Sequence, residues 1–239
     1  MLIFVEKVNE RLTYTFDFIF KERDLSYVFT SSEAEFEKSL DEKFNYSQKK
    51  FGATPSITPS TILFNNSIEN LTLNKCLFNE EECLTINGIC DPVASIFYIL
   101  TRYEEYHSSF KDKHGRYIGK KSVLYRFGWH EKAMCDRWSE DILCFLSSNA
   151  AFRYEKKKYR PQIIPTFDID KAYAYKHKGI LRNILGYLKD FYSKDITLTK
   201  ERRMVLAGSK KDPFDNYDKI FEIQSRGFDV KLFWMLGNY

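Results

Sequence analysis

The sequence predicts an α/β protein built from two domains. Strand, helix and strand patterns follow one another after residue 160, and such a βαβ unit implies a parallel sheet. Before that point short strands mix with helices. The pattern of predicted elements changes at the charged stretch "RYEKKKYR", 153–160. We therefore expect a mixed αβ N-terminal domain over 1–157 and a second domain over 158–239.

The composition of the chain excludes several classes of protein. The chain has 239 residues, of which 44% are hydrophobic and 17% aromatic, enough for a substantial core. The formal charge of +4 comes from 37 basic and 33 acidic residues scattered along the chain, whereas nucleic-acid binding needs a concentrated basic stripe. The start, "MLIFVEKVNER", lacks a basic n-region, and no apolar run approaches ~20 residues. We expect no nucleic-acid partner, no signal peptide, no membrane span and a cytoplasmic location.

The cysteines follow no metal or redox motif. Five are present, with no CxxC pair, at 76, 83, 90, 135 and 144. The first three cysteines are spaced seven residues apart, which fits neither a zinc knuckle nor a zinc ribbon. Free thiols in a reducing compartment are the simplest expectation.

The first ninety residues predict short elements. "MLIFVEKV" is typical of a strand. "NERLTYTFDFIFKERD" fits both an alternating and a helical pattern, and we favour a helix capped by Asn9. "LSYVFT" predicts a strand and "SSEAEFEKSL" a short helix capped by Ser31 or Ser32. Short strands and turns fit 41–90 best.

Two stronger helices follow. Asp91 is a good N-cap and Pro92 a good first helical residue for a helix that ends before the exit at 107–109. Its expected buried face is Ile96, Ile99, Leu100 and Tyr103. "DRWSEDILCFLSSN" predicts the second helix, with Trp138, Ile142, Phe145 and Leu146 at helical spacing.

The second domain begins with "PQIIPTFDID", in which Ile163, Ile164 and Phe167 predict a short buried strand. "GILRNILGYLKDFY" predicts a helix, and a polar stretch follows. Asp212 and Pro213 are expected to open another helix, after which "VKLFWML" predicts a buried strand. Strands 163–167 and 229–235 should then be adjacent and parallel.

Most polar groups have ordinary structural interpretations. His107, His114, His130 and His177 contain no HxxxH or HxH pair. "DKHGRY", 112–117, is typical of a turn. Arg102 and Glu105 are spaced for a surface ion pair, although an anchoring network between the domains is the alternative.

Asp168 and Asp170 stand out because they follow an apolar strand. Being two apart, they face one side of a strand, at the carboxyl end where α/β proteins place their chemistry. The alternative is that Asp170 caps the next helix and Asp168 lines a solvated loop. Two such carboxylates can divide the work of metal hydrolysis, one as ligand and one as base for a metal-bound water. Zinc would also need histidines from elsewhere.

The stretch "IIPTFDIDKAYAYKHKG" resembles the first motif of the polysaccharide deacetylases, the NodB-homology group of carbohydrate esterase family 4. "DPVASIFYILTRYEEY" and "DKHGRY" resemble the uncharacterised N-terminal domain that precedes such modules in Bacteroidetes proteins. The resemblance implies that 158–239 is the start of a distorted, incomplete (β/α) barrel in a longer protein. It assigns Asp168 as the catalytic base, and it moves the metal-ligand role from Ile169, at the usual position, to Asp170.

The resemblance also implies an activity. The expected protein is a metal-dependent hydrolase of carbon–nitrogen bonds other than peptide bonds, removing acetyl groups from an N-acetylated carbohydrate. Its cofactor is expected to be a divalent metal, zinc, bound only in a longer chain that supplies the family's His-x-x-x-His motif, which is absent here. The alternatives are a non-catalytic carbohydrate-binding or assembly protein with a degenerate deacetylase fold, and an interaction domain without a small-molecule site.

Overall fold

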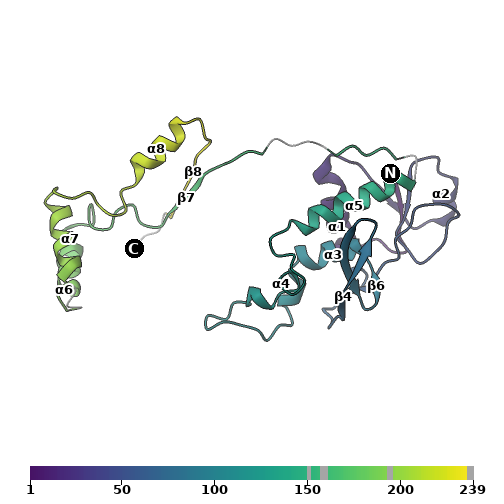
Figure 1. The fold of residues 1–239 in the computed structure, drawn as a ribbon, viewed down its shortest axis with the longest axis horizontal. Helices are drawn as coiled ribbons and strands as arrows, with labels where there is room; N and C mark the ends of the chain where they lie inside the picture. The colour runs from purple at the N-terminus through teal and green to yellow at the C-terminus, as the bar shows by residue number, and fades with distance from the viewer. Residues whose placement is uncertain (150–151, 157–160, 193–195, 236–239) are drawn as a thin grey trace. The chain divides into compact units, whose positions relative to one another are not determined.

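The computed structural model describes residues 1–149, 152–156, 161–192 and 196–235. The chain divides into two compact units, Met1–Lys158 and Tyr159–Tyr239. Both combine helices with small sheets, so the protein belongs to the mixed α/β class that the sequence predicts (Figure 1). Within the described ranges, no helix has the length and apolar character needed to cross a membrane.

Unit 1 contains two three-stranded sheets. The first is parallel, with β1 (Leu2–Phe4) between β2 (Val28–Thr30) and β3 (Lys43–Asn45). The second is an antiparallel meander of β4 (Leu73–Phe78), β5 (Glu81–Ile86) and β6 (Ile89–Cys90). The helices are α1 (Glu10–Phe20), α2 (Glu33–Lys38), α3 (Pro92–Leu100), α4 (Val123–Arg126) and α5 (Met134–Asn149).

The helical interpretation of the ambiguous segment after Asn9 is confirmed. The Asn9 side chain accepts a hydrogen bond from the Leu12 backbone N–H at 3.0 Å and so caps α1. Leu12, Phe16 and Ile19 are buried at helical spacing, which an alternating strand would not allow. Ser32 caps α2 in the same way.

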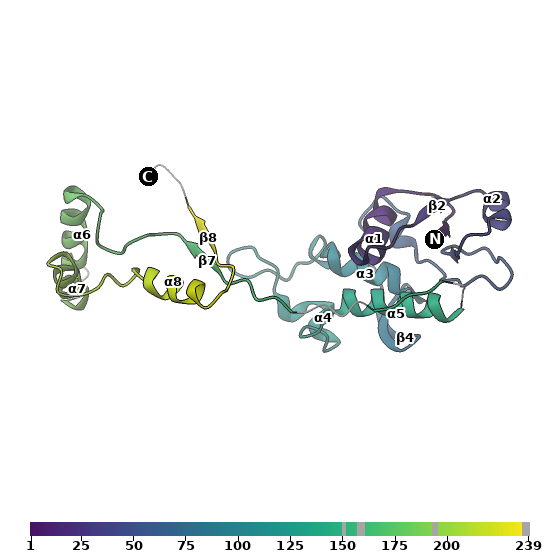
Figure 2. The ribbon, with the colours of Figure 1, turned by 90° about the horizontal axis from the view of Figure 1, so that it is seen from above.

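Helix α3 is the central element of the core of unit 1. Its N-cap Asp91 accepts hydrogen bonds from the Ala94 N–H at 3.0 Å and, from outside the helix, the Tyr46 hydroxyl at 2.8 Å and the Ser60 N–H at 2.7 Å. The helix packs against α1, α5 and β5, and the two views agree on the grouping of the three helices (Figures 1 and 2). It is therefore buried on all sides from Pro92 through its first two turns.

The four residues predicted to be mostly buried all contact the core, although the helix ends before the last of them. Ile96 is fully buried, but Ile99 and Leu100 are only partly buried because they lie at the end of the helix. The helix stops at Leu100 because Arg102 adopts a left-handed conformation with φ of 53°. Tyr103 is buried, but it belongs to a separate 3₁₀ turn, Tyr103–Glu105.

The expectation of free thiols is wrong for two of the five cysteines. Cys76 lies directly opposite Cys83 on the neighbouring strand, and Cys90 lies on the third strand of the meander. Cys76 and Cys90 form a disulfide with a Cα–Cα distance of 5.9 Å. A spacing of seven is about one strand plus its turn, so antiparallel pairing brings all three cysteines together.

Unit 2 contains the parallel pair that the sequence predicts. Strand β7 (Thr166–Ile169) pairs with β8 (Lys231–Trp234) in parallel register. Between them lie α6 (Ile180–Tyr192), α7 (Ile196–Leu206) and α8 (Tyr217–Ser225), of which α7 falls in the stretch described only as polar from the sequence.

A buried ion pair joins α6 to α7. Arg202 Nε lies 2.8 Å from Asp190 Oδ2. Gly186 makes room for this arginine, because an added Cβ would lie 2.5 Å from the guanidinium. The two helices lie side by side in both views (Figures 1 and 2).

The prediction that strands β7 and β8 are buried is wrong. Ile163 and Ile164 are 68% and 46% exposed, and the strand begins only at Thr166. Strand β8 is exposed along its whole length. Among the described residues each strand has one partner and the pair lacks the second covering layer that buries a parallel sheet.

Candidate carboxylate site

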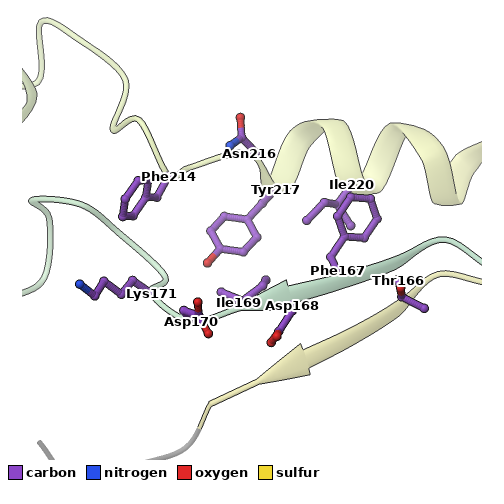
Figure 3. Close-up of a pocket in the computed structure, with 10 residues that line it drawn as sticks. All are labelled: Thr166, Phe167, Asp168, Ile169, Asp170, Lys171, Phe214, Asn216, Tyr217 and Ile220. Atoms are coloured by element: carbon purple, nitrogen blue, oxygen red, sulfur yellow. The ribbon is translucent and has the colours of Figure 1, made fainter. Parts of the chain in front are cut away.

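Asp168 and Asp170 lie on one face at the carboxyl end of β7. Thr166, Asp168 and Asp170 are exposed, whereas Phe167 and Ile169, between them, are partly buried. Figure 3 shows Phe167 pointing toward Ile220 of α8 and Asp168 pointing away from that helix. Alternation along a strand therefore leaves the carboxylates on the open side of the sheet.

The structure decides against the two ordinary roles considered for these carboxylates. Asp170 precedes the start of α6 at Ile180 by ten residues, so it does not cap that helix. Asp168 lies in the strand, not in a loop, and pairs in register with Phe233.

An open pocket of about 590 Å³ surrounds the strand end. It is lined by the whole of β7, by the following loop and by the start of α8, through Thr166, Phe167, Asp168, Ile169, Asp170, Lys171, Phe214, Asn216, Tyr217 and Ile220 (Figure 3). Aromatic rings gather around Tyr217 of α8, on the face of the strand opposite Asp168 (Figure 3). Tyr217 stacks on Trp234 with ring centroids 6.0 Å apart, and Tyr173 lies 5.9 Å from Tyr217.

Asp212 holds the wall of this pocket in place. Its carboxylate accepts backbone hydrogen bonds from Ala174 at 2.7 Å, Tyr175 at 2.8 Å, Lys176 at 3.1 Å and Phe214 at 3.0 Å. The prediction that Asp212 opens a helix is wrong, because α8 begins at Tyr217. An Asp-Pro pair is typical of a helix N-cap, but the same carboxylate can also hold a loop. Here it accepts hydrogen bonds from a loop that is distant in the chain.

The metal-ligand set at this site is incomplete. Among the residues that the structure describes, the one group of three close metal-binding side chains is Cys76, Cys83 and Cys90, two of which form the disulfide. Within the described ranges no third ligand joins Asp168 and Asp170, whereas zinc sites in proteins use at least three. These two carboxylates therefore do not fit a zinc site by themselves.

The ordinary interpretations of the other polar motifs are confirmed. Asp112 Oδ1 accepts hydrogen bonds from the backbone N–H groups of His114 and Arg116, at 2.8 and 3.0 Å, which closes the turn. Arg102 Nε lies 2.6 Å from Glu105 Oε1 in the expected surface ion pair.

Sequence reasoning missed this aromatic cluster and the Asp212 anchor. Tyr173, Tyr217 and Trp234 are far apart in the chain and meet only in the folded unit. The high aromatic content of the chain was the one available signal, and it does not say which rings meet.

The fold and this site define a two-unit α/β protein with a carboxylate-bearing strand end in its second unit. Residues 1–150 match the family described as "Family of unknown function (DUF7033)", and the chain belongs to this family. No curated protein and no solved structure matches the chain.

Proposed function

We propose that the chain belongs to a metal-dependent hydrolase of the polysaccharide deacetylase type, acting on an N-acetylated carbohydrate. The observation that carries the proposal is the placement of Asp168 and Asp170 on one face at the carboxyl end of a parallel strand, inside a pocket. Parallel α/β folds place their reactive groups at this end of the strands.

The proposed roles follow from the chemistry of the two carboxylates. Asp168 accepts the proton of the water that attacks the acetyl carbonyl. Asp170 is one ligand of the divalent metal, zinc, whose other ligands lie outside the described residues. The rings of Phe214 and Tyr217, which line the same pocket, offer apolar surface for a sugar ring.

Open surfaces of unit 2 support the further proposal that it is the start of a larger (β/α) barrel. Within the described ranges, β7 and β8 pair only with each other, so each leaves one edge free for another strand. Helix α6 also exposes an apolar row of Ile180, Leu181, Ile184, Leu185 and Leu188. A complete barrel would cover both features.

The test uses the native protein purified from its source cells. Acetate release from an oligomer of N-acetylglucosamine is measured together with bound zinc. Asp168→Asn should lower acetate release at least ~100-fold while zinc stays bound, since a general base contributes ~10²–10⁴-fold. Asp170→Asn should lower zinc content, because a neutral amide is a poorer ligand.

Asp215→Asn, a change of the same kind in the loop before α8, is the matched control and should alter neither measurement. Equal zinc content in wild type and Asp170→Asn would refute the ligand role. Absence of acetate release from zinc-loaded native protein would instead favour the non-catalytic carbohydrate-binding alternative, for which the incomplete ligand set is the supporting observation.

A further inference from the structure

A second, smaller pocket lies in unit 1, in the part of the chain that matches the family. It measures about 230 Å³ and forms where the segment after α3 meets the loop that contains "DKHGRY". The side chains that matter are Tyr98, Tyr103, Glu104, His107, Phe110 and Tyr117, and we call this site the tyrosine pocket. It unites two motifs that the proposed hydrolysis does not use.

The tyrosine pocket contains an unused hydrogen-bonding group. Tyr98 lines the pocket and is only 5% exposed. In the described part of the chain its hydroxyl has no hydrogen-bond partner, whereas the hydroxyl of Tyr103 accepts from the Glu69 N–H at 2.8 Å. The hydroxyl oxygen still reaches solvent in the pocket, so it is accessible to a ligand there.

Glu104 gives the tyrosine pocket a negative charge. Its Oε2 accepts the Val123 backbone N–H at 2.8 Å, and no cation of the described chain forms an ion pair with it. Burial raises the pKa of the Glu104 carboxyl, and the hydrogen bonds from the Val123 N–H and the Tyr117 hydroxyl, with the more distant charge of Arg126, only partly offset this effect. A partly buried carboxylate that has no ion-pair partner gains from a ligand that supplies a cation.

The aromatic walls favour the same kind of ligand. The faces of tyrosine rings carry partial negative charge and attract ammonium groups within about 6 Å. The rim already shows this contact, since the Lys121 ammonium lies 5.3 Å from the centre of the Phe110 ring. The deeper rings of Tyr98 and Tyr103, with centroids 5.5 Å apart, are left for a ligand.

We propose that the tyrosine pocket binds an amino sugar, whose ammonium group pairs with Glu104 and whose ring hydroxyl bonds to the Tyr98 hydroxyl. The volume is below the ~300 Å³ lower limit for drug-sized ligands, which suits one sugar ring. The sugar part of this assignment rests on the proposed function, since deacetylation of an N-acetylated sugar leaves a primary amine. The ammonium part rests on the pocket alone.

Calorimetric titration of the full chain tests this assignment with four probes: glucosamine, N-acetylglucosamine, glucose and ethylammonium. Glucosamine should bind at least ~10-fold more tightly than N-acetylglucosamine or glucose, since neither carries a cation for Glu104. It should also bind more tightly than ethylammonium, which lacks hydroxyls for Tyr98. Equal binding of glucosamine and N-acetylglucosamine, or no binding of glucosamine, would overturn the proposal. Equal binding of ethylammonium would overturn its sugar part.

Variants assign the binding to this pocket. Glu104→Gln should weaken glucosamine binding at least ~10-fold, and its amide oxygen can still accept the Val123 N–H. Tyr98→Phe keeps the ring and should cause a smaller, severalfold loss. Glu105→Gln is the matched control, since Glu105 pairs with Arg102 and does not line the pocket. Unchanged affinity in Glu104→Gln would place the binding elsewhere. Asp168→Asn leaves this measurement unchanged, so failure of the proposed hydrolysis is scored separately.

Discussion

Replacing Asp212 with asparagine should release the loop of residues 174–176 from the segment that carries Asp212. The carboxylate is only 2% exposed and accepts four backbone N–H groups, from Ala174, Tyr175, Lys176 and Phe214. An asparagine offers one oxygen in place of two, and its NH₂ group would face N–H donors. The change therefore removes about half of the hydrogen bonds that hold the loop and leaves backbone N–H donors unsatisfied.

The magnitude follows from the pKa of this group. Burial raises the pKa of Asp212, but the four N–H hydrogen bonds outweigh burial and lower it from 3.8 to about 2. At 1.36 kcal/mol per unit, this shift corresponds to about 2 kcal/mol of local stability. Because the folded-state pKa is depressed, the contribution is complete above pH 3.8 and is lost as the pH falls toward 2.

Hydrogen exchange at pH 6 measures the effect directly. Protection of the Ala174, Tyr175 and Lys176 amides should fall roughly thirtyfold in Asp212→Asn, as about 2 kcal/mol implies. Asp215→Asn, three residues along the same loop, should leave the protection unchanged. Protection in Asp212→Asn within about twofold of wild type would refute the assignment of Asp212 as the anchor of this loop.

Two further predictions concern unit 1. Intact-mass measurement without reductant should show one disulfide, and replacing Cys76 and Cys90 together by serine should cost about 3 kcal/mol of unfolding free energy, as expected for a closed loop of this length, while Cys144→Ser should have little effect. Ile96→Ala should cost about 2–5 kcal/mol in denaturant unfolding and Leu100→Ala clearly less, because only Ile96 is fully buried; equal losses would contradict the packing of α3.

Local signals in the sequence were enough for several elements. Asn9 and Asp91 cap their helices through hydrogen bonds to residues three positions along, so the cue and its effect lie in one short segment. The same holds for the turn closed by Asp112. The parallel pairing of β7 with β8 was also predictable, because βαβ connections follow a general rule.

By itself, the sequence determined the capped helices α1, α2 and α3, the parallel pairing of β7 with β8, and that two acidic side chains end a strand on one face. Only the tertiary structure decided that Cys76 and Cys90 form a disulfide, that Asp212 clasps residues 174–176, and that Tyr98 and Glu104 share a pocket. The physical reason is the separation in sequence over which each interaction acts. Capping and alternation act within a few residues, whereas a disulfide, a loop anchor or a pocket depends on which distant segments pack together, and local patterns do not specify that packing.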